Sequence, residues 1–120
     1  MLKPSKYGAG VFATHNIKVG TRLRLFGDEY SRYMDFEDVP EVFRKYCIER
    51  KQVIICPVDF GSMPVGWYLN HSDTPNASIS SDPDNIYEWY AARDITINEE
   101  ILIDYNAFDE PHEAKEDYYK

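Results

Sequence analysis

Two segments of the chain carry the same pattern of residues at a constant offset of 78 positions, the separation of Ile17 from Ile95. Each segment has an aromatic residue followed by Ala, then Ile, then a residue that forms turns readily, then an aliphatic residue. The equivalent residues are Phe12, Ala13, Ile17, Gly20 and Leu23 in the first segment and Tyr90, Ala91, Ile95, Asn98 and Ile101 in the second. Gly and Asn are the residue types that best tolerate a left-handed backbone conformation. The repeat therefore predicts two similar strand–turn–strand corners and a mostly β fold.

Other apolar runs predict further strands and one helix. Strands are predicted over residues 21–26, 53–56, 86–92 and 101–103. A helix is predicted over residues 35–50, with Asp38 as its N-cap and Pro40 in its first turn. The apolar residues that recur there at helical spacing are Val39, Val42, Phe43, Tyr46 and Cys47.

A chain of 120 residues, of which 43% are hydrophobic, fits one domain with one core. We expect the core of that domain to span about residues 5–108, followed by an acidic C-terminal tail over residues 109–120. No apolar run reaches membrane-spanning length, and residues 1–6 lack the apolar stretch of a signal peptide. The sequence therefore predicts an intracellular protein, cytoplasmic or nuclear and not secreted, that does not act at a membrane.

The formal net charge of the chain is −8. This charge argues against direct binding to nucleic acid, because a phosphate-backbone binder needs a basic face. An acidic surface would suit a cationic partner, and it would serve solubility alone equally well.

Cysteine and histidine residues do not form the pattern of a metal site. For Cys47 and Cys56, two buried thiols are the expected interpretation, rather than a disulfide or half of a zinc site. His15, His71 and His112 are too scattered along the sequence to indicate shared ligation. We therefore predict no metal site.

Two polar segments are associated with apolar runs. Residues 70–76 directly follow the apolar run 67–69, and residues 99–105 include the strand predicted over 101–103. Polar groups beside a core must find hydrogen-bond partners or incur a desolvation cost. The two segments are therefore the candidates for a functional site.

These two segments resemble the paired C-terminal motifs of SET-domain protein-lysine methyltransferases, in a minimal form without zinc-binding flanks. The matching residues are Asn70-His71-Ser72 with Pro75-Asn76, then Glu99-Glu100 and Asp104-Tyr105. The resemblance extends over residues 8–105, beginning with a Gly-x-Gly segment. In that family the C-terminal motif threads through a loop to form a pseudoknot. The resemblance implies a mostly β, β-clip-like fold of small sheets with this pseudoknot and one short inserted helix.

The resemblance also implies an activity and a set of site residues. We expect methyl transfer, dependent on S-adenosylmethionine, to the side-chain amine of lysine in a protein, with a histone-like protein as one candidate substrate. The substrate would present a basic, lysine-containing segment. The implied roles are catalysis for Tyr105; cofactor binding for Gly8, Gly10, Asn70 and His71; and lining of the lysine channel for Tyr68, Ile103 and Phe108.

Methyl transfer to lysine needs strict placement of the reacting groups. The amine must be neutral, although free Lys has a pKa of about 10.4. A dry channel beside the positive sulfonium of the cofactor would lower that pKa by desolvation and by repulsion. A phenol hydroxyl and backbone carbonyls would supply polar alignment, for which Tyr105 is the candidate.

The sequence departs from the family pattern at two positions that bear on the site. Trp67 stands where Arg commonly precedes the Asn-His-Ser stretch. Ile103 stands two residues before the catalytic Tyr, where Phe or Tyr is common and influences how many methyl groups are added. The number of methyl groups transferred is therefore open.

Two other functional classes remain as alternatives. The chain could be a SET-like module that binds a peptide or the cofactor without turnover, or a β-rich scaffold that binds no cofactor. With no accessory domain predicted, a substrate would be recognised by the chain's own groove or through a partner, for which a second copy of the chain is one candidate.

Overall fold

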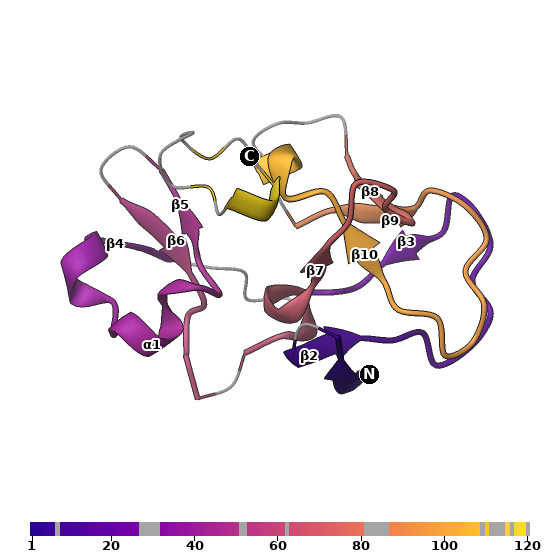
Figure 1. Ribbon diagram of the computed structural model, residues 1–120, viewed down its shortest axis with the longest axis horizontal. Helices are drawn as coiled ribbons and strands as arrows, with labels where there is room; N and C mark the ends of the chain where they lie inside the picture. Colours follow the sequence, from indigo (N-terminus) through magenta and orange to yellow (C-terminus); the bar gives the residue numbers. More distant parts are fainter. Residues whose placement is uncertain are drawn as a thin grey trace.

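The structure is a computed structural model that describes residues 1–6, 8–26, 32–50, 53–61, 63–80, 87–108, 110, 115 and 117–119. Within these residues, most of the regular structure consists of short strands in four small sheets (Figure 1). The predicted mostly β architecture is therefore confirmed. None of the helices in this part of the chain has the length and apolar character that crossing a membrane requires.

The four sheets pair strands both near and far apart in sequence. The pairs and triplets are the antiparallel hairpin β1 (Leu2–Ser5) and β2 (Gly8–Val11); the order β3 (Arg22–Leu23), β9 (Trp89–Ala91) and β8 (Ala77–Ile79); the order β4 (Arg32–Met34), β6 (Ile54–Cys56) and β5 (Ile48–Glu49); and the parallel pair β7 (Asn70–His71) and β10 (Leu102–Ile103). The helical turns are η1 (Phe36–Asp38), α1 (Glu41–Arg44), η2 (Val65–Tyr68), η3 (Tyr105–Phe108) and η5 (Asp117–Tyr119).

The internal repeat forms two corners that pair with each other. Ile17 and Ile95 exchange two backbone N–H···O hydrogen bonds, each 2.8 Å long. The side chains of Asp94 and Asn16, equivalent in the repeat, accept backbone N–H groups from the opposite corner at 2.8 Å. The two loops run side by side at one end of the molecule (Figure 1). The repeat is thus a pair of interlocked corners with approximate two-fold symmetry.

Gly20 and Asn98 occupy the left-handed region that the sequence predicted for the turn of each corner, with φ values of 84° and 69°. Their backbone N–H groups donate to the equivalent carbonyls of Ala91 and Ala13, at 2.8 and 2.9 Å. Each corner therefore depends on a residue that accepts positive φ.

We expect Asn98→Val to lower the free energy of unfolding by about 1–2 kcal/mol, because a β-branched side chain is strained at positive φ. Asn98→Gly should change it by much less, since Gly adopts this conformation freely. Urea unfolding of both variants measures the difference. Thr96→Val, at an exposed position two residues earlier in the same corner, is the control. Equal effects of Val and Gly at position 98 would contradict the backbone explanation.

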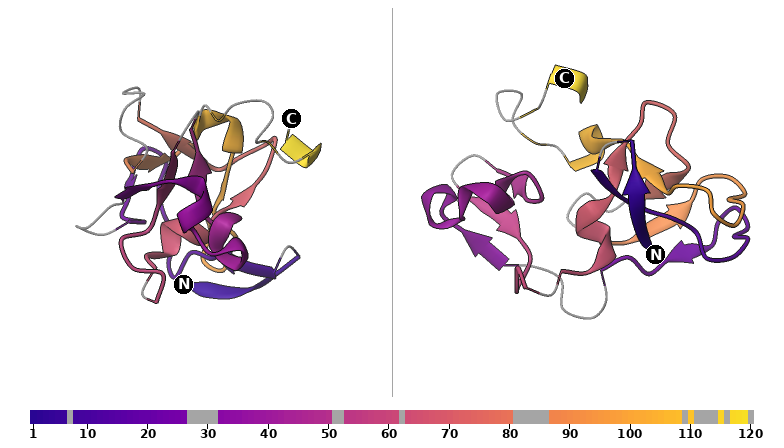
Figure 2. Two further views of the ribbon diagram at one scale, coloured as in Figure 1. Left: turned by 90° about the vertical axis from the view of Figure 1, so that its left-hand side faces the viewer. Right: turned by 60° about the horizontal axis from the view of Figure 1, so that its bottom comes forward.

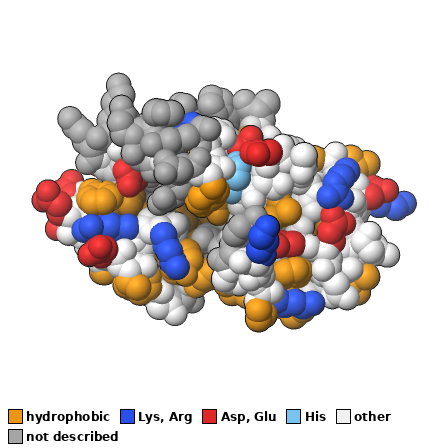
Figure 3. Space-filling model, viewed as in Figure 1, with side chains coloured by type: hydrophobic (Ala, Val, Ile, Leu, Met, Phe, Trp, Pro, Cys, Tyr) orange, Lys and Arg blue, Asp and Glu red, His pale blue; other side chains and the backbone are white. Residues whose placement is uncertain are grey.

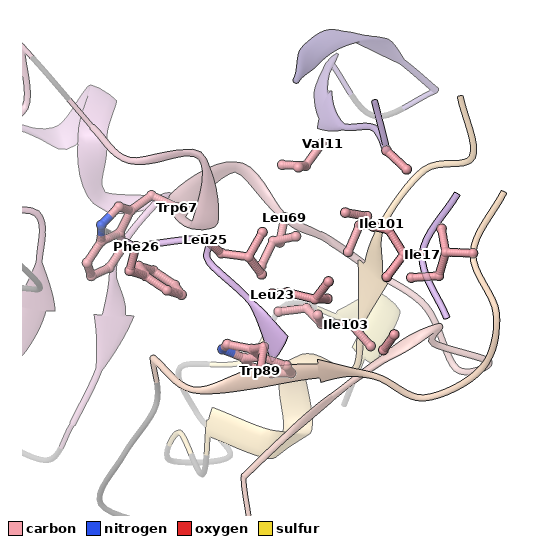
Figure 4. Close-up of a cluster of buried hydrophobic side chains, with 14 of the residues drawn as sticks. Val11, Ile17, Leu23, Leu25, Phe26, Trp67, Leu69, Trp89, Ile101 and Ile103 are labelled. Atoms are coloured by element: carbon pink, nitrogen blue, oxygen red, sulfur yellow. The ribbon is translucent and has the colours of Figure 1, made fainter. Parts of the chain in front are cut away.

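The core lies between the two corners and extends toward the helical turn η2. Figure 4 shows side chains from both halves of the repeat meeting there, among them Val11, Leu23 and Ile101. Trp89 is 1% exposed, and its ring packs edge-on against Phe108 with 5.7 Å between centroids. Segments distant in sequence are therefore held together by one buried cluster.

The predicted helix over residues 35–50 is wrong in extent. That segment forms η1, the four-residue α1 and then β5, which pairs with β6. Pro40, rather than Asp38, is the N-cap of α1, and Val42 is 69% exposed. A single turn of helix gains little by itself, whereas the apolar end of the segment gains by pairing with β6 and burying Ile48.

Two strand predictions over short apolar runs are confirmed. The run 53–56 contains β6, all of which is buried, and 101–103 contains β10. The predictions over 21–26 and 86–92 were too long, since only β3 and β9 are strands there, and residue 86 lies outside the described residues.

Candidate functional site

The two polar segments singled out in the sequence lie against each other. β7 and β10 are parallel neighbours, and Ser72 N–H donates to the Ile103 carbonyl at 2.8 Å. Asn76, the buried polar residue at 1% exposed, accepts Leu102 N–H at 2.8 Å and donates to the Glu100 carbonyl at 2.8 Å. Because its amide is paired on both sides, Asn76 joins the segments without an unsatisfied buried group.

His71 supports the backbone at the start of η3. Its Nδ1 accepts the Tyr105 backbone N–H at 3.0 Å, and its Nε2 lies 3.0 Å from Asp73 Oδ1. Since Nδ1 must accept, the neutral ring carries its proton on Nε2 and donates it to Asp73. His71 thereby positions Tyr105 through the main chain.

The Tyr105 side chain is half-buried and its hydroxyl has one defined partner. The hydroxyl donates to the Leu69 carbonyl at 2.6 Å. The pKa of Tyr105 is raised well above its usual value, chiefly by burial of the side chain and to a smaller extent by the nearby Tyr118 and Tyr119. The phenol therefore stays protonated at neutral pH and presents a polar group held beside a backbone carbonyl.

Residues of the predicted acidic tail pack over this site where the structure describes them. The Tyr119 side chain is buried, and its ring centroid lies 5.1 Å from that of Tyr105 and 5.5 Å from that of His71. The Tyr119 hydroxyl donates to one Glu110 oxygen at 2.9 Å, and Glu49 N–H in β5 donates to the other at 3.0 Å. Glu110 thus links the tail to the β4–β6–β5 sheet.

A pocket of about 370 Å³ lies beside Tyr105. One wall comes from the insert, which comprises β4, η1, α1, β5 and β6; the other walls come from η2, β10, η3 and the tail. In the right-hand view of Figure 2 the insert lies apart from the core ribbons, with η5 above the space between them. Of the predicted channel residues, Ile103 and Phe108 line the pocket together with Tyr105.

Tyr68, the third predicted channel residue, is not among the residues that line this pocket. Its ring instead contacts that of Tyr46, with 5.2 Å between centroids. Sequence reasoning missed Tyr46, Trp67 and Tyr119 as lining residues. The abundance of Tyr in the chain was the available signal, but it does not say which rings meet.

Asn70 belongs to a polar cluster next to the β1–β2 hairpin. Its Nδ2 donates to Glu100 Oε2 at 2.8 Å and to the Ala9 carbonyl at 3.0 Å. Ser5 Oγ lies 3.1 Å from both Glu100 oxygens. Because both main partners of Nδ2 are acceptors, the orientation of the Asn70 amide is determined.

The two predicted cofactor glycines have different surroundings. Gly8 has φ 105° and open space where a Cβ would lie. A Cβ on Gly10 would collide with Glu100 Oε2 and would lie 2.8 Å from the Ser5 Cβ. The space beside Gly10 is thus occupied by the Glu100 carboxylate, whereas Gly8 leaves its side open.

The Glu99 side chain has other hydrogen-bond partners than that of its neighbour Glu100. Its carboxylate contacts Arg93 at 2.7 Å and accepts from Asn76 at 3.2 Å. Chiefly the Arg93 hydrogen bond lowers the pKa of Glu99. Both carboxylates are therefore tied to fixed donors, as expected of scaffold charges.

Metal-ligating groups do not gather in the part of the chain that the structure describes. No group of three or more His, Cys, Asp or Glu residues there could hold a metal ion, and His112 lies outside that part. Neither Cys47 nor Cys56 is in a disulfide. Cys56 lies in β6, Cys47 directly precedes β5, and burial raises the pKa of Cys47 to about 12. On the face in Figure 3, described acidic and basic side chains are interspersed, without a continuous basic area.

Comparisons with known proteins agree with this geometry. The profile of the family described as the SET domain matches residues 8–106. No curated protein sequence matches the chain significantly. Among solved structures, a histone methyltransferase candidate from Plasmodium falciparum is similar, with a TM-score of 0.58 and 27% identity over 88% of this chain and 90% of that one.

A second similar structure is KRYPTONITE in complex with mCHG DNA and SAH. Its TM-score is 0.57 and its identity is 24% over 92% of this chain. The chain spans 24% of the length of that protein, so this likeness concerns the fold alone.

Proposed function

The chain belongs to the SET-domain family, and from that membership we propose that it transfers a methyl group from S-adenosylmethionine to the side-chain amine of a lysine in a protein. Methyltransferase chemistry in general is supported by the family and by its structural neighbours. The observation that carries the lysine proposal is the Tyr105 hydroxyl, which donates to the Leu69 carbonyl at 2.6 Å beside a pocket lined by several aromatic rings.

The residues near the β1–β2 hairpin fit an amino-acid-bearing cofactor. Since Asn70 Nδ2 is engaged by Glu100 and the Ala9 carbonyl, Asn70 Oδ1 is left to accept, and no described residue donates to it. An ammonium group such as that of S-adenosylmethionine would suit this oxygen. Gly8 adds open space at the same hairpin, which supports its proposed role in cofactor binding.

In this proposal the bound cofactor supplies an electrophilic methyl group on a positive sulfur. The aromatic rings around Tyr105 and Phe108 would shield the lysine amine from water once the substrate fills the pocket, which would favour the neutral form of the amine. The Tyr105 hydroxyl and the Leu69 carbonyl are the polar groups that align the amine. The lysine ammonium would lose its one proton to solvent before transfer, and the neutral amine held by Tyr105 and Leu69 would then take the methyl group to become a methylammonium, which would leave the cofactor sulfur as a neutral thioether.

Further features support the finer parts of the proposal. Pairing of β10 with β7, together with the Asn76 bonds to the segment 100–102, supports the family's pseudoknot. A net charge of −8 supports a basic segment around the target lysine. Ile103 is smaller than Phe or Tyr, so the number of methyl groups added stays open, and a homodimer and an intracellular location stay predictions.

We expect Glu100→Ala to weaken binding of S-adenosylmethionine about tenfold. The reason is that Glu100 holds the Asn70 amide with its oxygen outward, and losing one such hydrogen bond costs about 1.4 kcal/mol. Isothermal calorimetry with the cofactor alone measures this effect.

Glu99→Ala is the matched control for that experiment. It removes a neighbouring carboxylate that contacts Arg93 and Asn76 but not Asn70. This variant should lose stability without losing cofactor affinity. Equal losses of affinity in the two variants would show that Glu100 acts only through the general stability of the segment.

Calorimetry of cofactor binding, followed by a methyl-transfer assay on histones, ribosomal proteins and lysine peptides, tests the proposed function as a whole. Binding with transfer supports the enzyme. Binding without transfer to any of these substrates would favour the module that binds without turnover.

A further inference from the structure

Trp67 carries a buried polar atom without a partner. The residue is only 6% exposed, and its indole nitrogen Nε1 is inaccessible to solvent. This nitrogen has no hydrogen-bond partner among the described residues. The ring itself is well packed, with its centroid 5.5 Å from that of Phe26 in an edge-on contact. Burying an N–H group without an acceptor is unfavourable, so the position of this donor calls for an explanation.

The indole lies at the pocket beside Tyr105. Trp67 is in η2, two residues before Leu69, whose carbonyl holds the Tyr105 hydroxyl, and it is one of the pocket-lining residues. Figure 4 shows the indole nitrogen turned away from the buried cluster formed by Leu69, Leu25 and their neighbours. The unpaired donor therefore points away from these core side chains.

The chemistry of the indole determines what could pair with it. An indole N–H donates and cannot accept, so a substrate ammonium group, which also donates, cannot be its partner. Glu110, an acidic residue of the same pocket, already accepts from the Tyr119 hydroxyl and from Glu49 N–H. A ligand that satisfies the indole must bring its own acceptor oxygen. A peptide chain carrying a lysine has such an oxygen in its backbone carbonyl.

We propose that Trp67 is a substrate-binding residue whose indole N–H, covered in this structure, is uncovered by a small shift of the pocket wall when the substrate enters and then donates to a backbone carbonyl oxygen of the substrate chain, next to the target lysine. This inference rests on the proposed function, because it assumes that the pocket beside Tyr105 receives the lysine. A pocket of about 370 Å³ has room for more than one side chain, which suits entry of part of the substrate main chain. Trp67 would thus favour a lysine within a peptide chain over an amine without a backbone carbonyl.

Nuclear magnetic resonance can observe this bond directly, because the chain has two Trp residues and hence two indole N–H signals. Trp67→Phe assigns them. The probes are N-acetyl-lysine-N-methylamide, which has an ammonium group and two carbonyls, and n-butylamine, which has an amine alone. We expect both probes to shift signals of the ring of Tyr105, and only the first to move the Trp67 indole proton downfield. The Trp89 indole is the internal reference.

The outcomes separate this inference from the proposed function. If N-acetyl-lysine-N-methylamide shifts the Tyr105 signals but leaves the Trp67 indole proton unchanged, the inference is wrong and the proposed function stands. The same conclusion follows if n-butylamine moves the indole proton equally, since a displaced water would then explain the change. If neither probe affects the Tyr105 signals, the pocket beside Tyr105 does not bind lysine, and both the inference and the proposed function are overturned.

The Trp67→Phe variant supplies a second measurement. Its affinity for N-acetyl-lysine-N-methylamide should fall about tenfold, the effect of one lost hydrogen bond. Its affinity for n-butylamine should stay unchanged, which controls for altered packing. If both affinities fall by the same factor, the ring acts through packing alone and the inference is overturned.

Discussion

Tyr105→Phe is expected to slow methyl transfer by about a hundred- to a thousandfold, while the affinity for S-adenosylmethionine barely changes. Removing one preorganised polar contact from a dry site typically costs roughly 2.7–4 kcal/mol of transition-state stabilisation. The Tyr105 ring keeps its contacts with His71 and Tyr119 in the variant, so packing changes little. Single-turnover transfer, measured beside cofactor affinity, separates the two quantities.

Tyr90→Phe is the matched control for this prediction. Tyr90 lies on β9, and its hydroxyl donates to Glu88 at 2.7 Å, away from the Leu69 carbonyl. The control should leave both the transfer rate and the cofactor affinity near those of the parent. A Tyr105→Phe variant that turns over like the parent would remove Tyr105 from the catalytic centre and favour a module without turnover.

Gly10→Ala is expected to weaken cofactor binding about tenfold or more and to lower the free energy of unfolding by about 1–3 kcal/mol. The added methyl group would overlap the Glu100 carboxylate, and overpacking at a tight position costs this much. Displacing Glu100 would also release the Asn70 amide. A ligand at a hundred times its dissociation constant stabilises a protein by roughly 2.7 kcal/mol, so the parent should show a clear thermal shift and the variant a distinctly smaller one at the same cofactor concentration.

Two further variants show whether that effect passes through Glu100. Ala9→Ser, at the neighbouring exposed residue, should leave stability and binding nearly unchanged. Gly10→Ala combined with Glu100→Ala should recover stability relative to Gly10→Ala, because the overlapping carboxylate is gone, but it should not recover cofactor binding. A double variant no more stable than Gly10→Ala alone would contradict the proposed steric cause.

The sequence predicted those parts of the fold that depend on local chemistry repeated along the chain. The corners at Gly20 and Asn98 follow from residue types that accept positive φ, and the structure has both in that conformation. The prediction of a helix over 35–50 failed because helical spacing is a local signal. Pairing of β5 with β6 is a contact between distant residues that the local pattern does not contain.

In the candidate site, too, the sequence indicated some residues, whereas contacts between distant residues could not be predicted from it. The resemblance to the SET family indicated Asn70, His71 and Tyr105, and these come together because β7 and β10 are neighbours. The close approach of the Glu100 carboxylate to Gly10 could not be anticipated, since the two residues are ninety positions apart in the chain. Likewise, the closure of the pocket by Tyr119 and the unpaired indole of Trp67 are properties of tertiary packing.

The central claim is that the chain methylates lysine, and the most direct measurement is transfer of labelled methyl from S-adenosylmethionine to an array of lysine-containing peptides. Each peptide is paired with a copy in which Lys is replaced by Arg. The account predicts label on a subset of the Lys peptides, none on their Arg copies, and a loss of about a hundredfold or more in rate with Tyr105→Phe. Calorimetric binding of the cofactor by the same preparation, with no label on any Lys peptide, histone or ribosomal protein, would contradict it.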